Sequence, residues 1–423
     1  MTSRLDASYA VIRKTGVPTG WQEKKVADLV RVVGGGTPNR DDSAYWRDGG
    51  IPWITPTDLT ANKGKYIREG AEHISDAGLA NSNATLAPPG SIIFSTRGTV
   101  GNLAIAGVPL TTNQSCETLV PKDVEVSSEF LYYLLNYGMF AFHRLAGGTT
   151  FGAITRREIG RVWLALPDGN EQAAIARVLD SVDAAIDRAQ NSVDAARNVQ
   201  ASVIQSLVAK CVSSSKSRTL GDLILEGPTN GLYRPESDYG AKGTPIVRID
   251  SFDNGSITNL PGLRRVVVPS VIRERFALKQ GDVLINRVNA LTHVGKAAVV
   301  PELSEPTLFE SNMMRLRCAE TLVPDFLGVI LRSDIARRHW LARSKPAVNQ
   351  VSVNQRDTKS LCLPLPDLDR QREVSQAVHA ADALILRGQE RISTLQSLKE
   401  SLMHDLLTGA VRVSPTILQE QQA

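Results

Sequence analysis

The chain has 423 residues, of which 42% are hydrophobic and 22% charged, values typical of a globular protein with two or three domains. Its net charge of +4 is compatible with a nucleic-acid partner but too small to indicate one. No run approaches the ~20 apolar residues that a membrane span needs. Four scattered cysteines without a C-x-x-C pair argue against a disulfide framework or a zinc site. We therefore expect a cytoplasmic protein without a membrane partner.

The chain divides into six segments, among which two pairs are alike. Two long mixed modules contain Gly, Pro, Thr and β-branched runs, and each is followed by a segment with helical periodicity. In order, the segments are a short N-terminal piece (1–19), the first mixed module (20–161), the first helical segment with its linker (162–217), the second mixed module (218–361), the second helical segment (362–413) and a C-terminal tail (414–423).

Two glycine-rich stretches in the first module are candidate binding loops. The stretch 34–38 lacks the Gly-Lys-Ser/Thr ending of a phosphate-binding loop, and Pro38 stands where a helix would have to continue. We therefore interpret it as a structural turn. In the stretch 147–152, small residues and hydroxyl groups would let the backbone approach a DNA surface closely, although an ordinary connecting loop fits this composition equally well.

The two mixed modules repeat one another weakly. The matching stretches, first module first, are Ile51–Ile54 with Thr244–Val247, Pro89–Ile93 with Gln280–Ile285, Gly101 with Gly295, and Gln114-Ser115 with Glu310-Ser311. An arginine follows a matched predicted strand in each module, Arg97 in the first and Arg287 in the second. A shared frame with different loops is typical of two domains that bind different targets.

Polar side chains suited to base edges follow these strands. Arginine pairs bidentately with guanine, and asparagine with adenine, in the major groove of DNA. The alternative is that these residues only end a strand and solvate a turn. The candidate DNA-binding residues are Thr37, Arg97, Thr99, Asn102, Gly148, Thr149, Thr150, Arg287, Asn289, Lys345, Asn349 and Gln350.

The helical segments are two copies of one pattern, in which each residue of 162–210 has a counterpart 199 positions later. Apolar or small residues recur at alternating steps of four and three, which is typical of a coiled-coil seam. Asp168 and Asp367 precede the helices and are interpreted as their caps. The residues expected to pair the helices are Ile175, Leu179, Val182, Ile186, Val193, Val203, Leu207, Val374, Val378, Ile385, Ile392, Leu395, Leu402 and Leu406.

One polar residue interrupts each seam, at the equivalent positions Gln200 and Lys399. In an antiparallel pair these two residues do not meet, and each is expected near the Pro-Asp turn that begins the other helix, where a polar seam residue costs little and can fix the register. We therefore predict an α+β fold. Two similar mixed α/β modules are separated by two long helices paired as an antiparallel coiled coil, in a pseudo-two-fold arrangement.

A search for catalytic motifs finds none. Neither Pro-Asp pair is followed by the carboxylate-x-lysine of a nuclease metal site, and the six histidines lack metal-ligand spacing. A dinucleotide fingerprint, a serine nucleophile elbow and an amino-methyltransferase motif are also missing. We therefore predict a chain that is not an enzyme by itself and holds no metal or cofactor of its own.

In their order, these motifs resemble the specificity subunit of Type I restriction–modification enzymes over nearly the whole chain. The resemblance rests on Gly35–Pro38, Tyr45-Trp46 and Ile51–Ile54 in the first module, Leu164–Pro167 with Glu171-Gln172 and Leu363–Pro366 with Arg370-Gln371 at the helix starts, and Leu406–Val413 at the C-terminal end. There are two departures. Gly227-Pro228-Thr229 replaces the Gly-Gly-Thr-Pro of the first module, and Arg370 replaces the acidic residue that Glu171 supplies.

The resemblance implies that the modules are target-recognition domains, each reading one half of a split double-stranded DNA site, while the helices set the spacer. It also implies docking of two modification subunits, which methylate adenine with S-adenosylmethionine, and of two restriction subunits, which hydrolyse ATP with Mg. Those cofactors would belong to the partners. The alternative is a bivalent coiled-coil scaffold for ligands other than DNA. A salt-dependent, sequence-selective DNA shift distinguishes the two.

Overall fold

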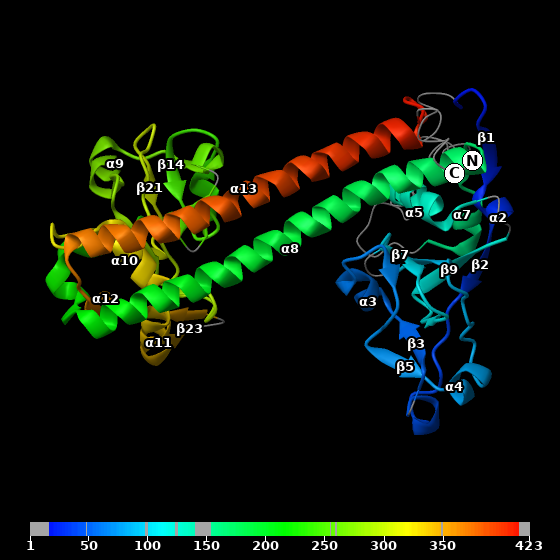
Figure 1. Ribbon diagram of the computed structural model, residues 1–423, viewed down its shortest axis with the longest axis horizontal. Coiled ribbons are helices and arrows are strands. Elements are labelled where there is room, and N and C mark those ends of the chain that lie inside the picture. The colour runs from blue at the N-terminus through cyan, green and yellow to red at the C-terminus, as the bar shows by residue number, and fades with distance from the viewer. Residues whose placement is uncertain are drawn as a thin grey trace. The chain divides into compact units, whose positions relative to one another are not determined.

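The computed structural model describes residues 17–47, 49–97, 100–122, 126–139, 154–253, 255–258, 260–347 and 350–413. Its contacts divide the chain into two units, residues 1–188 with 392–423, and residues 189–391. Each unit contains one mixed module and about half of each long helix, as the chain colours in Figure 1 show. The division therefore runs through the helices and not between helices and modules.

The first module is built on two sheets with the strand orders β2-β9-β6-β7-β4 and β5-β3-β8. The strands are β2 (Val30–Gly34), β3 (Ile51–Ile54), β4 (Tyr66–Ile67), β5 (Glu72–Ile74), β6 (Ile92–Ser95), β7 (Leu103–Ala106), β8 (Thr111–Thr112) and β9 (Cys116–Pro121). The pairs β4 with β7 and β3 with β8 are parallel, and the others are antiparallel. A separate antiparallel pair, β1 (Gln22–Lys25) with β10 (Trp163–Leu166), closes the module before the first long helix.

Short helices connect these strands and complete the core. They are α2 (Val26–Leu29), α3 (Pro56–Ala61), α4 (Asp76–Ala80), α5 (Ser128–Tyr137) and α7 (Arg156–Gly160). Hydroxyl caps explain where two of them begin, because Thr55 accepts a hydrogen bond from the backbone N–H of Asp58 and Ser127 accepts one from that of Phe130. Helix α5 buries its apolar side chains in the same core as the first turns of the long helix that follows.

The second module has a similar arrangement of sheets and short helices. Its larger sheets have the orders β12-β22-β18-β20 and β13-β17-β14-β21. The strands are β12 (Ile224–Asn230), β13 (Tyr239–Gly240), β14 (Thr244–Val247), β17 (Arg265–Val266), β18 (Val283–Asn286), β20 (Ala297–Val299), β21 (Leu308–Phe309) and β22 (Met313–Cys318). The parallel pair β14 with β21 corresponds to β3 with β8. The helices are α9 (Ser270–Phe276), α10 (Pro324–Leu331), α11 (Asp334–Arg343) and α12 (Gln355–Lys359).

Three smaller strand groups complete this module. They are β15 (Phe252–Asp253) with β16 (Ser256–Ile257), β19 (Val288–Asn289) with β24 (Gln350–Ser352) and β23 (Lys345–Ala347), and β11 (Ser217–Thr219) with β25 (Cys362–Pro364). The pair β11 with β25 corresponds to β1 with β10 of the first module, since each pair precedes a long helix. The linker expected at the end of the segment 162–217 is short, because the preceding helix runs to Ser214 and β11 begins at Ser217.

The two long helices are α8 (Gly169–Ser214) and α13 (Leu368–Leu407), and their first turns are capped as expected. Asp168 accepts a hydrogen bond from the backbone N–H of Glu171 at 3.0 Å, and Asp367 accepts the equivalent bond from Arg370 at 2.8 Å. Helix α13 is followed by Gly409 in the left-handed region, at a φ of 68°, where glycine is favoured as a helix terminator. No described helix is long and apolar enough to cross a membrane.

The helices pair antiparallel within each unit, which confirms the expected fold class. In the first unit Lys399 contacts Asp183, and in the second unit Gln200 contacts Asp382. Nearby in the second unit, a Cβ added to Gly388 would lie 2.5 Å from a methyl group of Val193. The two polar seam residues therefore do not meet each other, as predicted.

Their expected place near the Pro-Asp turns is wrong. Asp183 lies 15 residues beyond Asp168, which is about 22 Å along a helix. The reason is that α13 and the residues after it run alongside α8 as far as its first turn. There Arg412 binds the buried carboxylate of Glu171 through two contacts of 2.5 Å.

The seam residues are buried along most of the helices and shift by one position near the ends. Ile204 and Met403 are buried, whereas Val203 and Leu402 are only half-buried. A straight helix falls behind a seven-residue repeat by about 20° per heptad. Four heptads after Ile175, the residue that faces the seam is therefore 204 and no longer 203. Of the other expected pairing residues, Leu179, Val182, Val193, Val374, Val378, Ile385 and Leu406 are buried, and Ile186, Leu207, Ile392 and Leu395 are half-buried.

Candidate nucleic-acid interface

Arg97 follows β6 in the first module and exposes its side chain. Its charge and the 2.7 Å contact from Arg156 act on Glu117, whose carboxyl is mostly buried. Burial raises the pKa of Glu117 above its usual value, and the two arginines oppose this increase. Arg97 is therefore an exposed cation beyond the end of β6, where it can reach an anionic or polar ligand.

Two other candidates of the first module are held within the module. The hydroxyl of Thr37 donates to the side-chain oxygen of Gln114 at 2.5 Å. The side-chain amide of Asn102 donates to the hydroxyl of Thr60 at 2.8 Å. The remaining candidates of this module, Thr99, Gly148, Thr149 and Thr150, lie outside the described residues, as does Asn349 of the second module.

The glycines before Thr37 allow two backbone segments to approach closely, and residues 35–38 continue from β2 as irregular chain instead of forming the expected turn. A Cβ on Gly35 would lie 2.0 Å from the carbonyl oxygen of Asn113. The N–H of Gly36 donates to the carbonyl of Thr112 at 2.9 Å, and its carbonyl accepts from the indole of Trp53 at 2.8 Å. Thr37 is therefore presented by a fixed segment.

In the second module, the equivalent glycine is Gly231. A Cβ there would lie 2.2 Å from the carbonyl oxygen of Glu310. The backbone N–H of Glu310 donates a hydrogen bond to the carbonyl of Val247. In the first module, the N–H of Asn113 donates the equivalent bond to the carbonyl of Ile54. The expectation that Gly227-Pro228-Thr229 replaces the glycine signature is therefore wrong. The match of Gln114 with Glu310 is also wrong by one residue.

The two arginines that follow matched strands do not occupy matched positions. The backbone N–H of Thr96 donates to Ser115, and that of Arg287 donates to Asn312. The carbonyl of Thr96 accepts from Ile154, and that of Arg287 accepts from Val353. Arg287 is therefore the counterpart of Thr96, and the counterpart of Arg97 is Val288. Because successive side chains of an extended strand point to opposite faces, this one-residue slip reverses the side on which the arginine lies.

Arg287 is engaged by its own module. Its side chain is half-buried, and its Nη1 donates to the carbonyl oxygen of Ser311 at 3.2 Å. This contact holds the turn that precedes β22, which is the task that Thr96 performs in the first module through its 3.2 Å hydrogen bond to Ser115. The geometry therefore favours a supporting role for Arg287 and leaves Arg97 as the more accessible of the two.

The structure brings most of the second module's remaining candidates into one small sheet. Asn289 lies on β19, Gln350 on β24 and Lys345 on β23. In the register of this sheet, Lys345 is opposite Ser352 and Asn289 is opposite Val351. Because side chains alternate between faces, Lys345 and Gln350 share one face and Asn289 lies on the other. Lys345 and Gln350 are exposed, so their face can meet a ligand.

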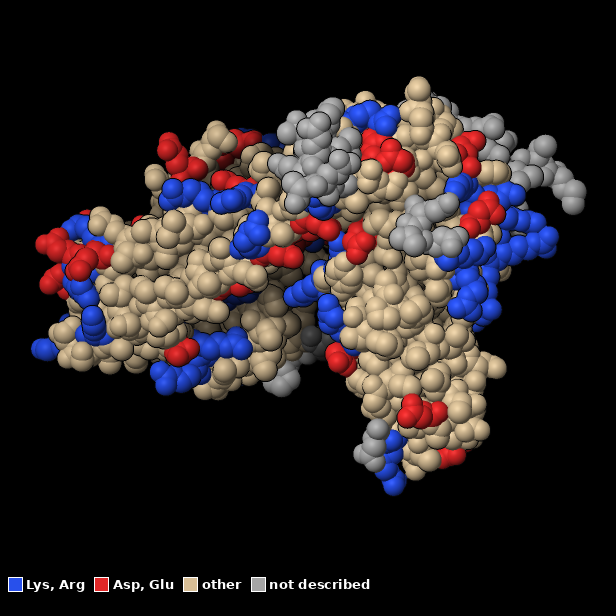
Figure 2. All heavy atoms as spheres, turned by 45° about the vertical axis from the view of Figure 1, so that its right-hand side comes forward, with Lys and Arg blue, Asp and Glu red and all other residues tan. Residues whose placement is uncertain are grey.

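The sequence motifs did not single out α11, which supplies further cations next to this sheet. Arg337 donates to the carbonyl oxygen of Leu291 at 3.2 Å and so holds the turn after β19. Arg338 and Arg343 are exposed, and Arg343 ends the helix directly before the strand of Lys345. The signal was present as three arginines in a helix of ten residues. Figure 2 shows that Lys and Arg side chains gather in separate patches with acidic side chains among them.

Each module is fastened by hydrogen bonds to the long helix that follows it, through a buried glutamine at an equivalent position of the repeat. The side chain of Gln172 accepts a hydrogen bond from the backbone N–H of Ser127 at 3.1 Å and donates to the carbonyl of Pro167 at 3.0 Å. Gln371 accepts from the N–H of Val323 at 2.8 Å and donates to Pro366 at 2.9 Å. Ser127 and Val323 are the N-cap residues of α5 and α10. The repeat is therefore a repeat of contacts as well as of sequence.

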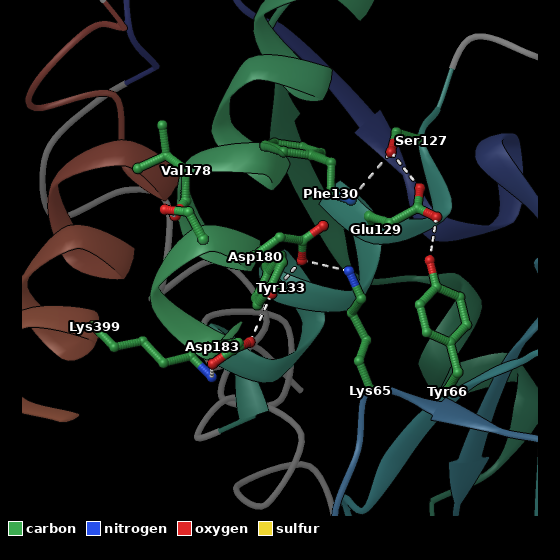
Figure 3. A network of polar contacts seen from close by, with 11 residues as sticks. Lys65, Tyr66, Ser127, Glu129, Phe130, Tyr133, Val178, Asp180, Asp183 and Lys399 are labelled. Atoms are coloured by element: carbon green, nitrogen blue, oxygen red, sulfur yellow. Dashed lines mark hydrogen bonds and ion pairs between the residues drawn. The ribbon is translucent and has the colours of Figure 1, made fainter. Parts of the chain in front are cut away.

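A second fastening lies further along α8 and is drawn in Figure 3. The hydroxyl of Tyr133 lies 2.6 Å from a carboxylate oxygen of Asp180 and 2.7 Å from one of Asp183. Lys65 also pairs with Asp180, and Lys399 of α13 pairs with Asp183 at 2.6 Å. The motifs gave no weight to these aspartates. The signal that would have found one of them is the recurrence of Asp183 as Asp382, 199 positions later.

The described part of the chain contains no group of His, Cys, Asp or Glu side chains that could hold a metal ion. The arrangement consists of exposed cations and amides on small sheets, each carried by a module fastened to a helix. Such an arrangement is suited to binding a polar, anionic partner.

Residues 18–193 match the family model of the Type I restriction modification DNA specificity domain. This part of the chain is therefore similar to Type I restriction–modification DNA specificity domains. The match covers the first module and the first half of α8, and it confirms the resemblance stated from the sequence motifs.

Relatives of this chain show the same similarity. Over 169 residues, 40% of this chain, it is 37% identical to the MjaIX specificity subunit of Methanocaldococcus jannaschii, and the alignment covers 39% of that protein. It is 30% identical over 191 residues, 44% of this chain, to the putative MjaX specificity subunit of that organism, with 44% of the relative covered. The chain thus spans less than half the length of these two relatives. The EcoKI specificity subunit of Escherichia coli strain K12 is 20% identical over 94% of this chain and 89% of its own length.

Solved structures show the same fold beyond the specificity domain. The crystal structure of the Type-I restriction-modification system S subunit from M. genitalium has a TM-score of 0.54 and 16% sequence identity, and the match covers 92% of this chain and 96% of that one. A chain from a structure of the type I R-M system has the same TM-score and identity over 93% of this chain and 99% of its own. The order of two modules and two long helices is therefore shared.

Proposed function

We propose that this chain is the DNA-binding specificity subunit of a Type I restriction–modification complex. Each module reads one half of a bipartite site on double-stranded DNA, and the paired helices set the spacer between the halves. The observation that carries the proposal is the repeated fastening by Gln172 and Gln371, each of which binds the N-cap residue of its module's helix. Two modules held alike, with different surface residues, are suited to reading two different sequences on one ligand.

The specificity is proposed to reside in the exposed polar residues of the two modules. Arg97 in the first module, and Lys345 with Gln350 in the second, are exposed and unlike one another. Arginine and amide side chains hydrogen-bond base edges, while lysine contributes mainly to phosphate contact. The two modules therefore have different contact chemistry on a common frame, which supports different half-sites.

The catalytic steps are proposed to belong to partner subunits. Two modification subunits would methylate adenine with S-adenosylmethionine, and two restriction subunits would hydrolyse ATP with Mg. The chain itself would be non-catalytic and would act in the cytoplasm. The bivalent scaffold for ligands other than DNA has no specific observation in its favour.

The test is to express the chain with its modification subunits and to map methylated adenines across a genome or a random plasmid library. The proposal predicts one bipartite motif with a fixed spacer, and a change of one half only when residues 20–161 are exchanged for a homologous module. Methylation without a bipartite motif, or a change of both halves on the exchange, would contradict it. A DNA shift by the purified complex should also weaken steeply with salt.

A further inference from the structure

Asp183 and Asp382 are equivalent in the repeat, and each is contacted from two sides. In the first unit, Asp183 receives the hydroxyl of Tyr133 from the module and Lys399 from α13. In the second unit, Asp382 receives both terminal nitrogens of Arg332, each at 2.8 Å, and the side-chain amide of Gln200 from α8. Each of these two aspartates therefore contacts both the module of its unit and the other long helix of the pair.

The charge at the two sites is balanced in different ways. Lys399 supplies the cation for Asp183 from the opposite helix, and the module supplies only a neutral hydroxyl. For Asp382 the module supplies the cation, Arg332, and the opposite helix supplies a neutral amide. The aspartate side chains are 29% and 34% exposed. A partly buried carboxylate is stabilised by a nearby cation, and each site provides one.

The module side of the first site is a buried, directional contact. Burial and the two aspartates raise the pKa of Tyr133 far above its usual value, so its hydroxyl keeps its proton. A hydroxyl carries a single proton, so Asp180 and Asp183 share one donor and are held together around it. Lys65, which precedes β4, neutralises Asp180 and ties the edge of the module's sheet to the same point, as Figure 3 shows.

The geometry of these contacts determines how tightly the orientation of a module on the helix pair is fixed. Apolar contacts have no angular requirement, whereas hydrogen bonds weaken steeply when their angles change. One extra base pair displaces a half-site by ~3.4 Å and rotates it by roughly 35° around the duplex. A module held by apolar contacts alone would accommodate part of such a change. One held by a charged, hydrogen-bonded network resists it.

We propose that Asp183 and Asp382 are positioning residues for DNA recognition, which fix the direction of each module on the helix pair and so restrict the complex to one spacer length. The inference rests on the proposed function and deepens it. The aspartates touch no base. They act through Tyr133 and Arg332, the module residues that they hold.

The test uses the full chain with its modification subunits and a plasmid library in which the two half-sites are separated by the preferred spacer or by one base pair more or fewer. The measured quantity is the ratio of methylation at the preferred spacer to that at its neighbours. The substitution Y133F leaves the Asp183–Lys399 pair intact, and R332Q leaves the Gln200–Asp382 contact intact. Each should lower the ratio about tenfold, because each removes a charge-assisted hydrogen bond, while the bases of both half-sites stay the same.

Two further comparisons separate positioning from simple stability. The matched controls D187N and E400Q alter exposed acidic residues of α8 and α13 and should leave the ratio unchanged. The exchange D183K with K399D restores the interhelical pair but not the contact with Tyr133, so the ratio should stay low. A uniform loss of methylation at all spacers, or an unchanged ratio in Y133F and R332Q, would overturn the inference. If the wild-type chain itself lacked any spacer preference, the proposed function would fail with it.

Discussion

Arg97 and Arg287 look alike in the sequence and differ in the structure, and the difference lies in one residue of register. The side chain of Arg97 is exposed, whereas that of Arg287 holds the carbonyl of Ser311. Sequence alone could not separate them, because the modules share only a weak pattern around their strands. A shift of one position in an extended strand changes the face on which a side chain lies.

The first prediction concerns these two arginines. Arg97→Ala should weaken binding to the specific site by about 1–3 kcal/mol, roughly 5- to 150-fold, and should relax selectivity in the first half-site if the side chain reads a base. Equilibrium binding to specific and unrelated duplexes, at several salt concentrations, measures this effect. A uniform loss on all duplexes with a smaller salt slope would instead assign Arg97 to a phosphate.

Arg287→Ala serves as the structural counterpart of that experiment. Because its guanidinium supports a turn of the second module, its removal should lower the stability of the protein, with no relaxation at a single base position. A loss of selectivity at one base of the second half-site, with unchanged stability, would show that Arg287 contacts that base directly.

At the scale of elements, the long helices were predictable, and the polar contacts that they make with the modules were not. The seam pattern, the caps at Asp168 and Asp367 and the terminating Gly409 each follow from local chemistry. The contacts of Asp183 and Asp382 could not be predicted, since an aspartate beside an apolar seam has the pattern of an ordinary solvated face. Which polar residue of a helix is covered depends on the module packed against it, and the helical period does not contain that information.

The second prediction concerns the buried glutamines that begin each helix. Gln172→Leu and Gln371→Leu each leave a backbone N–H of an N-cap residue and a proline carbonyl without their partner. An unsatisfied group of this kind costs about 1–3 kcal/mol, so each substitution should lower the free energy of unfolding by that amount in a urea titration. Gln396→Leu, at an exposed position of α13, is the matched control. A loss no larger than that of the control would show that these bonds do not fasten the modules.

At the scale of the whole molecule, the repeat accounts for much of the organisation. Both units are assembled from a module, the first half of one long helix and the second half of the other. The tandem sequence repeat predicted this organisation, because two copies of one segment make equivalent contacts when they pair antiparallel. The contact surfaces of the modules were less predictable, since they depend on loops in which the copies have diverged. Lys345 and Gln350 came together only through the pairing of β23 with β24.

The paired contacts also restrict how the helices can be lengthened. Asp183 with Lys399 and Asp382 with Gln200 obey one common register, so an insertion in α8 alone would break one of them. Seven residues inserted after Ala189, together with seven after its counterpart Gly388, keep both contacts, because seven residues make nearly two full helical turns. Each helix then becomes ~10 Å longer, which corresponds to roughly three base pairs of duplex DNA.

Mapping the methylation sites of this double-insertion variant, with its modification subunits, tests the central claim most directly. If the helix pair sets the distance between two independently reading modules, the bases of both half-sites stay the same and the preferred spacer becomes longer than that of the wild type. An active complex that keeps the wild-type spacer, or one whose half-site bases change, would contradict the account.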